Sequence, residues 1–336
     1  MRGHFSANGV LLVVFVCLSL CLAPKAAPAQ DDGKKDWPAN IRVLAGPKGG
    51  QWFTMGKPIA EILSKAVAPA TSRAGGGIVN IDSLNKGAGD IGFSLTSFRG
   101  TSLSGEPGYQ HIRFDDATIL VNIYPQVLYV LLSRAFAEKY GITDVGSLLA
   151  LKAPVRFASL KPGTASEFTL TLLLRHGYGK SFDTLRAQGW SLSFNNYDET
   201  VDNFAAGELD GFAFTAGTVV PLIQTLEKYT DVVLLPVSQG VLDALAHKFK
   251  TGTYTIKPGD YDCVRKPVTT LGDWTCLLVR KSLPASMVYA INKALWEQRD
   301  VISSVARDFG RLSPQTALPQ GMEAHPGSVA FWNSLK

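Results

Sequence analysis

Short apolar runs alternate along this chain with segments in which apolar residues recur every three or four positions. After the first run, for example, Trp52, Met55, Ile59 and Ile62 have the spacing of one face of a helix. Such alternation predicts an α/β protein with largely parallel sheets. Strands are predicted at residues 41–45, 91–95, 128–133, 155–158, 211–215, 232–235 and 275–280, and helices at 52–67, 79–86, 167–176, 200–206, 219–229, 241–250 and 285–299.

One local pattern occurs twice. A helix end, a glycine and an aspartate that opens an apolar strand stand at Gly87 and Asp90, and again at Gly207 and Asp210. Any helix-to-strand turn can use glycine and aspartate, and we expect both aspartates to be structural turn residues. The alternative is that two lobes share one plan, with their strands ending at a common crevice of the kind in which α/β sheets bind ligands.

A glycine-rich turn separates the first predicted strand from the first predicted helix. It contains Gly46, Gly49 and Gly50. Glycines let the backbone approach a ligand closely, and the N–H groups and dipole at a helix start favour an anion. Many α/β domains begin in this way, so the turn is a candidate anion site only. Trp52, in the first helical turn, either covers a ligand or packs in the core.

The first 29 residues have the pattern of a cleavable export signal. A short polar start is followed by an apolar run over residues 10–22, which is short for a membrane span, and then by small residues before Gln30. We therefore predict cleavage before Gln30 and a periplasmic protein, with an uncleaved anchor as the alternative. Residues 30–38 are predicted to be a solvated leader, and the rest is long enough for two hydrophobic cores.

Composition excludes several classes of function. The net charge of +5 includes Arg2 and Lys25 of the export signal, so the exported chain is nearly neutral and is not expected to bind nucleic acid. Its histidines are scattered, and we find no nucleophile elbow and no phosphate-binding loop, so we predict no enzyme, metal site or cofactor. Cys263 and Cys276 are the only cysteines after the export signal. An even count in an exported chain predicts a disulfide between them.

The order of several motifs identifies a family. Their sequence positions are the glycine turn and two aromatic residues at 46–53, Gly-Gly-Gly-x-x-Asn at 75–80, a Tyr-Pro pair at 124–125, Pro-Gly-Thr-Ala-Ser at 162–166 and His-Pro-Gly at 325–327. From residue 41 to the C-terminus the chain resembles the TAXI family of solute receptors, which serve TRAP transporters. It departs from the family pattern at Trp52 and Phe53, where tyrosines are usual, and at Gly77, where a serine is usual.

The resemblance implies a two-lobed periplasmic binding protein of type II fold with a hinge between the lobes. Lobe 1 would comprise residues 39–131 and 271–336, and lobe 2 residues 132–270, with the crossings near 128–133 and 275–280. Such a receptor is expected to be a monomer that binds a small solute between its lobes, of the glutamate or 2-oxoglutarate type, and delivers it to a TRAP-type permease. The alternatives are a receptor for an ABC importer or a sensor kinase, and an enzyme on the same fold such as a pyrimidine synthase.

Candidate ligand residues come from the loops at the predicted strand ends. Lys48 and Lys161, one in each lobe, suit the two negative groups of a dicarboxylate, although each is also interpretable as a solvated loop lysine. Asn80 closes a glycine run and is expected to donate to a carboxylate, with a plain turn asparagine as the alternative. The full set of predicted ligand-binding residues is Lys48, Gly49, Gly50, Trp52, Asn80, Ser94, Thr96, Lys161, Thr164, Ser166, Thr215 and Gly217.

Overall fold

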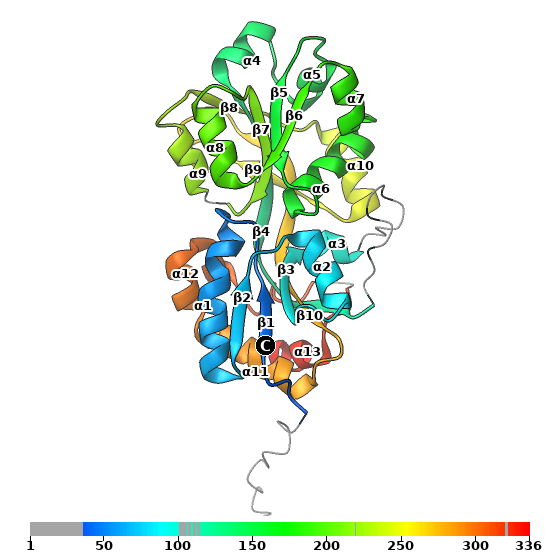
Figure 1. The fold of residues 1–336 in the computed structure, drawn as a ribbon, viewed down its shortest axis with the longest axis vertical. Coiled ribbons are helices and arrows are strands. Elements are labelled where there is room, and N and C mark those ends of the chain that lie inside the picture. The colour runs from blue at the N-terminus through cyan, green and yellow to red at the C-terminus, as the bar shows by residue number, and fades with distance from the viewer. Residues whose placement is uncertain are drawn as a thin grey trace, which may run out of the picture.

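The computed structural model describes residues 36–100, 106, 109, 112, 115–218, 220–319 and 322–336. They form two lobes, one above the other in Figure 1, joined by two long strands that run through both. The predicted export signal and most of the predicted leader lie outside the described residues. Within the described part, no helix has the length and apolar character needed to cross a bilayer.

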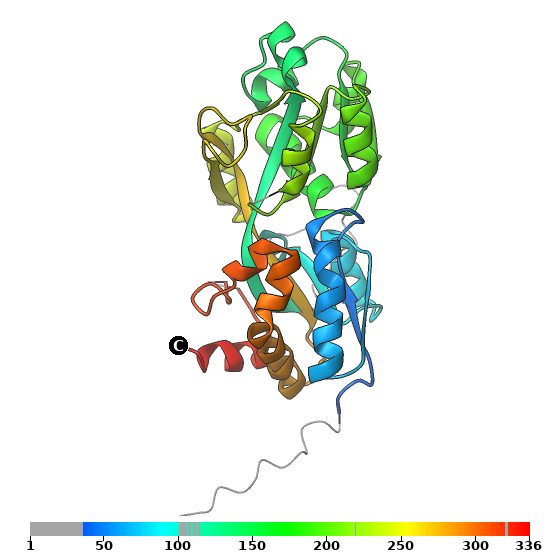
Figure 2. The ribbon, with the colours of Figure 1, turned by 90° about the vertical axis from the view of Figure 1, so that its left-hand side faces the viewer.

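Lobe 1 is built from the two ends of the chain. Helix α1 packs against α11 and α12, as Figure 2 shows from the side. The elements of this lobe are β1 (Ile41–Leu44), α1 (Gln51–Ala66), β2 (Ala70–Arg73), α2 (Gly77–Asn85), β3 (Ile91–Leu95), α3 (Thr96–Gly100), α11 (Ala285–Glu297), α12 (Arg299–Val305), the 3-10 helix η4 (Arg307–Arg311) and α13 (Pro326–Asn333).

Lobe 2 is formed by the middle of the chain. Its elements are α4 (Arg134–Tyr140), α5 (Val145–Ala150), β5 (Arg156–Leu160), α6 (Ala165–Leu172), the π-helix η3 (Leu173–Gly177), α7 (Phe182–Ala187), β6 (Ser191–Asn195), α8 (Tyr197–Ala205), β7 (Gly211–Ala216), α9 (Pro221–Leu226), β8 (Val232–Leu234), α10 (Gln239–Phe249) and β9 (Gly252–Ile256).

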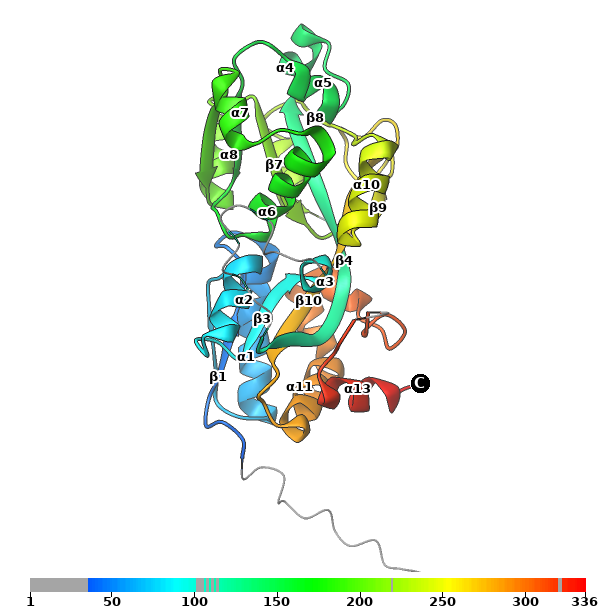
Figure 3. The same ribbon diagram turned by 90° about the vertical axis from the view of Figure 1, so that its right-hand side faces the viewer.

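The long strands β4 (Ala117–Ser133) and β10 (Val268–Arg280) connect the lobes, and Figure 3 shows β4 passing from one to the other. The path through the sheet is β2-β1-β3-β10-β4-β7-β5-β6, with β8 beside β4 and β9 beside β10. The pairs β1–β2, β1–β3, β5–β6 and β5–β7 are parallel. Every pair that includes β4 or β10 is antiparallel. The sheet is therefore mixed, and the prediction of largely parallel sheets holds only for the outer strands of each lobe.

Strand pairing locates the crossing between the lobes. Residues 128–133 of β4 already pair with β7 and β8 of lobe 2, and residues 275–279 of β10 already pair with β3 of lobe 1. The crossing thus lies near residues 126–128 of β4 and 270–273 of β10, at or just before the start of each predicted segment. Both strands are apolar on either side of this point, so hydrophobic periodicity does not mark it.

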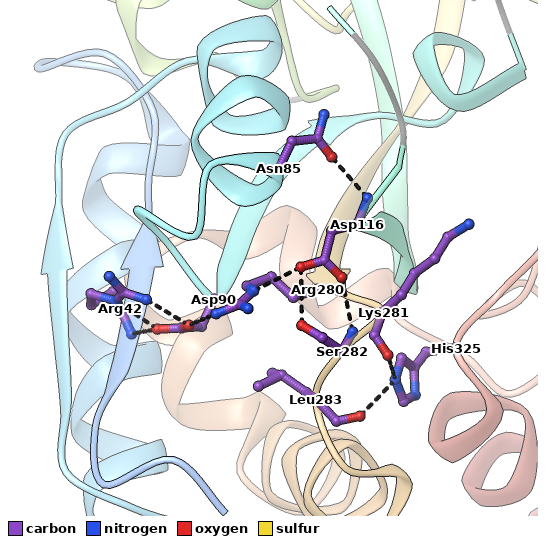
Figure 4. Close-up of polar contacts among 9 residues, drawn as sticks. All are labelled: Arg42, Asn85, Asp90, Asp116, Arg280, Lys281, Ser282, Leu283 and His325. Atoms are coloured by element: carbon purple, nitrogen blue, oxygen red, sulfur yellow. Dashed lines mark hydrogen bonds and ion pairs between the residues drawn. The ribbon is translucent and has the colours of Figure 1, made fainter.

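The repeated glycine–aspartate pattern forms the same structure in both lobes. Asp90 accepts hydrogen bonds from the backbone N–H of Arg42 at 2.8 Å and from its guanidinium at 2.8 and 2.9 Å. Asp210 accepts the corresponding bonds from Arg156 at 2.8, 3.2 and 2.6 Å. Each aspartate therefore ties the first parallel strand of its lobe to the strand that it opens itself. Figure 4 shows the lobe 1 copy, in which Arg280 adds a further bond to Asp90 at 3.4 Å.

The predicted disulfide is wrong, because both cysteines are free. Cys276 is buried in β10 within lobe 1, whereas Cys263 packs at the edge of the lobe 2 core. The residues between them include most of β10, and an extended strand advances roughly 3.3 Å per residue. Extended backbone that crosses from one lobe to the other keeps the two thiols apart, although they are close in sequence.

Candidate ligand-binding cleft

A cavity of about 340 Å³ lies between the lobes. This volume is at the small end of the range for ligand pockets, about 300–1,000 Å³. Lobe 1 and the crossing strands contribute Pro47, Gly49, Gly50, Gln51, Trp52, Thr54, Tyr124, Gln126, Val305, Ala306 and Arg307, and lobe 2 contributes Ala165, Ser166, Tyr197, Thr215, Ala216, Gly217, Val220, Pro221 and Leu222.

The first helix of lobe 1 begins at this cavity. Gly49 turns the chain with a φ of +83°, in the left-handed region that favours glycine, and Gly50 is the N-cap of α1 without a side-chain cap. The N–H groups of Gln51 and Trp52 have no backbone partner among the described residues, as is usual for a first helical turn. The positive end of the α1 dipole and two N–H donors are therefore available where these residues line the cavity.

Helix α6 of lobe 2 begins at the same cavity. Its N-cap is Thr164, whose hydroxyl accepts a hydrogen bond from Glu167. The next two residues, Ala165 and Ser166, line the cavity, and their N–H groups have no partner among the described residues. The Ser166 hydroxyl accepts a bond from the N–H of Thr215 at 2.9 Å, which fixes the start of α6 against the end of β7.

The N-terminus of α2 is used differently. The N–H groups of Ile78 and Val79 donate to the carbonyl oxygen of Gly163, across the interface between the lobes, at 3.1 and 3.2 Å. A Cβ on Gly77 would lie 2.9 Å from the Cβ of Ala165, so only glycine allows this approach without a shift. The glycine run at residues 75–77 therefore serves contact between the lobes, and the N-terminus of α2 does not open onto the cavity.

A directed chain of hydrogen bonds lies beneath the cavity. The indole N–H of Trp52 donates to Thr275 Oγ1 at 3.2 Å, and that hydroxyl donates its proton to Gln126 Oε1 at 2.8 Å. The proton of Thr275 is thus directed to the amide oxygen of Gln126, and the Gln126 Nε2 group remains as a donor. Tyr124 is fully buried, and its hydroxyl has no hydrogen-bond partner within the described part of the chain.

Tyr197 closes the lobe 2 side of the cavity. Its hydroxyl donates to the carbonyl oxygen of Thr215 at 2.9 Å. Burial raises the pKa of Tyr197 to about 12, so the phenol is neutral at physiological pH. Its ring lies against α1, because a Cβ on Gly50 would be 2.7 Å from Cε2 of Tyr197.

An aspartate next to the cavity joins the two lobes. Asp308 of η4 is buried and accepts a hydrogen bond from the hydroxyl of Thr218, in lobe 2, at 2.6 Å. It also accepts bonds from Gln51 at 3.2 Å and from Arg311 at 3.3 Å. Its charge is thus engaged by partners on both lobes. Arg307 is the one charged residue among those that the structure places on the cavity lining, and it is exposed at the mouth.

Half of the predicted ligand residues line the cavity. They are Gly49, Gly50, Trp52, Ser166, Thr215 and Gly217. They come from both predicted lobes, as expected for a site between them. The sequence left open whether Trp52 covers a ligand or packs in the core. Trp52 lines the cavity and also stacks on Phe93 of the core, with ring centroids 5.6 Å apart.

The other predicted ligand residues lie elsewhere. Lys48 and Lys161 are exposed and are not on the cavity lining, so their pairing with a dicarboxylate has no support in this structure. Asn80 is 1% exposed, and its amide nitrogen donates to the carbonyl oxygens of Leu44, Ala45 and Phe93, which makes it an internal brace between β1 and β3.

The three remaining residues, all hydroxyl-bearing, also have internal partners. Ser94 donates to the carbonyl oxygen of Gly77 at 3.2 Å, and Thr96 donates to Asn122 at 2.6 Å. Thr164 is the N-cap of α6. Since a hydroxyl has one proton to donate, Ser94 and Thr96 are not arranged to donate to a ligand, and Thr164 lies off the described cavity lining.

The sequence reasoning missed six polar residues of the lining: Gln51, Thr54, Tyr124, Gln126, Tyr197 and Arg307. Gln51 directly follows the glycine turn, and Tyr124 belongs to the Tyr-Pro pair, so the motifs pointed to both. Tyr197 starts a helix, and Gln126 interrupts an apolar strand, which is a weak signal for a buried polar role. Arg307 lies in a short 3-10 helix with no local pattern that indicates function.

Comparison with known proteins places the chain in a family. The family model described as NMT1-like matches residues 43–333. The chain belongs to the NMT1-like family. A search of curated proteins by sequence gives no match.

Solved structures share the fold. MatC from Rhodopseudomonas palustris, solved with bound malate, has a TM-score of 0.54 and 14% identity, covering 89% of this chain and 96% of MatC. A protein from Bordetella bronchiseptica RB50 has a TM-score of 0.50 and 13% identity, covering 88% and 89% of the two chains. These likenesses show the fold, and the predicted two-lobed α/β fold is confirmed.

Proposed function

We propose that this protein is an extracytoplasmic receptor that closes its two lobes on a small acidic solute and delivers it to a TRAP-type membrane permease. The observation that carries the proposal is the meeting of two helix N-termini, α1 from lobe 1 and α6 from lobe 2, at one cavity. A ligand that engages both helices binds the closed form better than the open form, and so shifts the equilibrium toward closure.

The electrostatics of the cavity support an acid. Each helix N-terminus carries the equivalent of roughly half a positive charge. No carboxylate is on the lining that the structure describes, and the nearby Asp308 already has partners on both lobes. An anion between α1 and α6 would therefore be stabilised by both dipoles and by otherwise unpaired N–H groups.

The motif resemblance to the TAXI family supports a TRAP-type permease as the partner, with an ABC importer or a sensor kinase as alternatives. MatC, which shares only the fold, was solved with malate, so dicarboxylates of the malate, glutamate and 2-oxoglutarate type belong in the first set of ligands to test. Delivery is tested by uptake of the identified solute into vesicles that contain a TRAP-type permease. Uptake should require the receptor, and uptake without it would contradict the partner assignment.

Binding is tested by thermal shift on residues 30–336. A panel of carboxylic acids is compared with the matching alcohols and amines, because a ligand of the folded state raises the melting temperature. We expect acids to raise it and their neutral and cationic counterparts to leave it unchanged. A shift confined to neutral or cationic compounds would refute the acidic-solute proposal.

A matched pair of variants connects binding to the cleft. Thr215→Val removes a hydroxyl of the lining and keeps the side-chain shape, whereas Thr255→Val makes the same change on the exposed strand β9. We expect the first variant alone to reduce the shift. Equal behaviour of the two would mean that the acid binds elsewhere.

A further inference from the structure

We propose that the solute has a single anionic group, carboxylate or sulfonate, on an apolar body, with the anion at the inner end of the cavity. This inference rests on the proposed function and narrows its ligand class. It is carried by the separation of polar donors at the inner end of the cavity from apolar side chains at its mouth.

The inner end offers donors that have no other use. Gln126 is only 4% exposed, and its oxygen is fixed by the proton of Thr275. The chain of bonds from Trp52 through Thr275 therefore leaves the Nε2 group as the part of the amide without a partner among the described residues. Gln126 lies on the cavity lining, so a ligand oxygen there can accept a hydrogen bond from this nitrogen.

Tyr124 is a second buried donor at this end. Its hydroxyl lacks a partner in the described structure although the side chain is completely buried. Burial raises the pKa of this phenol far above its ordinary value, so it is protonated at any physiological pH and can donate. Together with the N–H groups at the starts of α1 and α6, Tyr124 and Gln126 supply enough donors for the oxygens of one anionic head group.

Apolar side chains stand at the mouth of the cavity beside Arg307. The exposed or half-buried apolar side chains there are Pro221 and Leu222 from lobe 2 and Val305 from the end of α12 in lobe 1. Val305 is 50% exposed and so has apolar surface that a ligand can cover. An apolar ligand body would cover these side chains and remove apolar surface from water on closure.

A second carboxylate would find little to bind. Lys48 and Lys161 lie off the lining, and the exposed Arg307 is the cation that the described lining offers. An ion pair at an exposed position is screened by water and contributes little. A dicarboxylate would also have to place its second charge beside Val220 and Leu222. These side chains would displace water from the second carboxylate without offering hydrogen bonds in its place.

The test compares ligands of one chain length. The dissociation constants of hexanoate, hexane-1-sulfonate, adipate and hexan-1-ol are measured by calorimetry with residues 30–336. We expect the better of the two monoanions to bind at least tenfold more tightly than adipate, and hexan-1-ol not to bind. Adipate binding as tightly as hexanoate or more tightly, or hexan-1-ol binding as tightly as hexanoate, would overturn the inference.

The outcome is separable from that of the proposed function. Tight binding of adipate, or of a polar acid such as glutamate, with no binding of either monoanion would refute the single-anion inference and leave an acid receptor. The absence of binding by every acid in the wider panel would refute both. Preference between the carboxylate and the sulfonate identifies the head group.

Variants test where the anion lies. Gln126→Leu removes the donor amide and should weaken hexanoate or hexanesulfonate binding at least tenfold, whereas the matched change Gln239→Leu on the exposed face of α10 should not. Tyr124→Phe removes only the hydroxyl and should weaken binding severalfold without lowering the melting temperature, since that hydroxyl has no partner in the described structure. This variant keeps the test valid if Gln126→Leu fails to fold.

Arg307 distinguishes the two ends of the cavity. Arg307→Gln should reduce adipate binding more than hexanoate binding, because only adipate has a charge to place at the mouth. A larger loss for hexanoate would mean that the anion binds at the mouth, and would overturn the inference.

Discussion

Gly77→Ala should oppose closure of the lobes while leaving lobe 1 folded. The added Cβ would lie 2.9 Å from the Cβ of Ala165 and 3.2 Å from Cε2 of Phe98. Real Cβ atoms do not approach so closely, and the Ala165 methyl is held at the start of α6 and cannot rotate away. Gly77 has an ordinary backbone conformation outside the left-handed region, and alanine is the better helix former, so α2 itself loses nothing.

The size of the effect follows from the cost of overpacking, which is typically about 1–3 kcal/mol. The contact with Ala165 exists only when the lobes are together, so most of this cost falls on the closed form. The ratio of closed to open molecules should then fall by about 5- to 150-fold. Ligand affinity should fall with it, to the extent that the ligand binds only the closed form.

Hydrogen exchange measures the change in the ratio of closed to open molecules without any ligand. The N–H groups of Ile78 and Val79 are bonded to Gly163 only while the lobes are closed, so their exchange reports opening. In Gly77→Ala they should exchange faster, while the N–H of Asp90, which is bonded to Arg42 within lobe 1, should not. Gly240→Ala is the control, because a Cβ there meets nothing within 4 Å. Unchanged exchange at Ile78 and Val79 would refute the steric argument.

Four further outcomes are expected. Asp90→Asn should lower the free energy of unfolding by about 2–3 kcal/mol, which is more than Asp210→Asn should cost, because Asp90 is the more buried and has a second arginine partner. Equal losses of the two variants in urea melts would contradict this ranking. Burial alone would raise the pKa of Asp90, but the hydrogen bonds from its arginines outweigh burial and lower the pKa. The contribution of Asp90 to stability is therefore complete above its unfolded pKa of about 3.9 and is lost as pH falls through the lower folded value. Acid melts of Asp90→Asn against the parent would show this loss. Thr218→Val removes a hydrogen bond between the lobes and should speed the same reporter amides by about 5- to 10-fold, with no change contradicting a role in closure. Cys263 and Cys276 should titrate as two free thiols in denaturant and react slowly in the folded protein, where burial raises the pKa of both; a missing thiol signal would reinstate the disulfide.

Local sequence predicted much of the framework. The glycine–aspartate repeat correctly indicated two lobes of similar plan, because such a turn needs only neighbouring residues to form. The predicted helices and strands recur in the structure wherever one face is buried, as in α1 and β3. Strands β2, β6 and β9 were missed, since each has mostly exposed or half-buried side chains and so lacks the apolar alternation that marks a strand. Residues 117–127 of β4 are mostly buried and were missed as well.

The sequence by itself determined the two-lobed α/β plan and the glycine turns that bring helix N-termini to a shared cleft. Tertiary structure alone decided which polar groups remain available there. Asn80 and Gln126 are both buried amides, yet the donors of Asn80 are consumed by three carbonyl oxygens, while a chain of hydrogen bonds through Thr275 fixes the oxygen of Gln126 and leaves its nitrogen at the cavity. Likewise, β10 separates Cys263 from Cys276, which the sequence had paired. Hydrogen-bond partners and distances between segments are set by how the elements pack, and no local pattern encodes them.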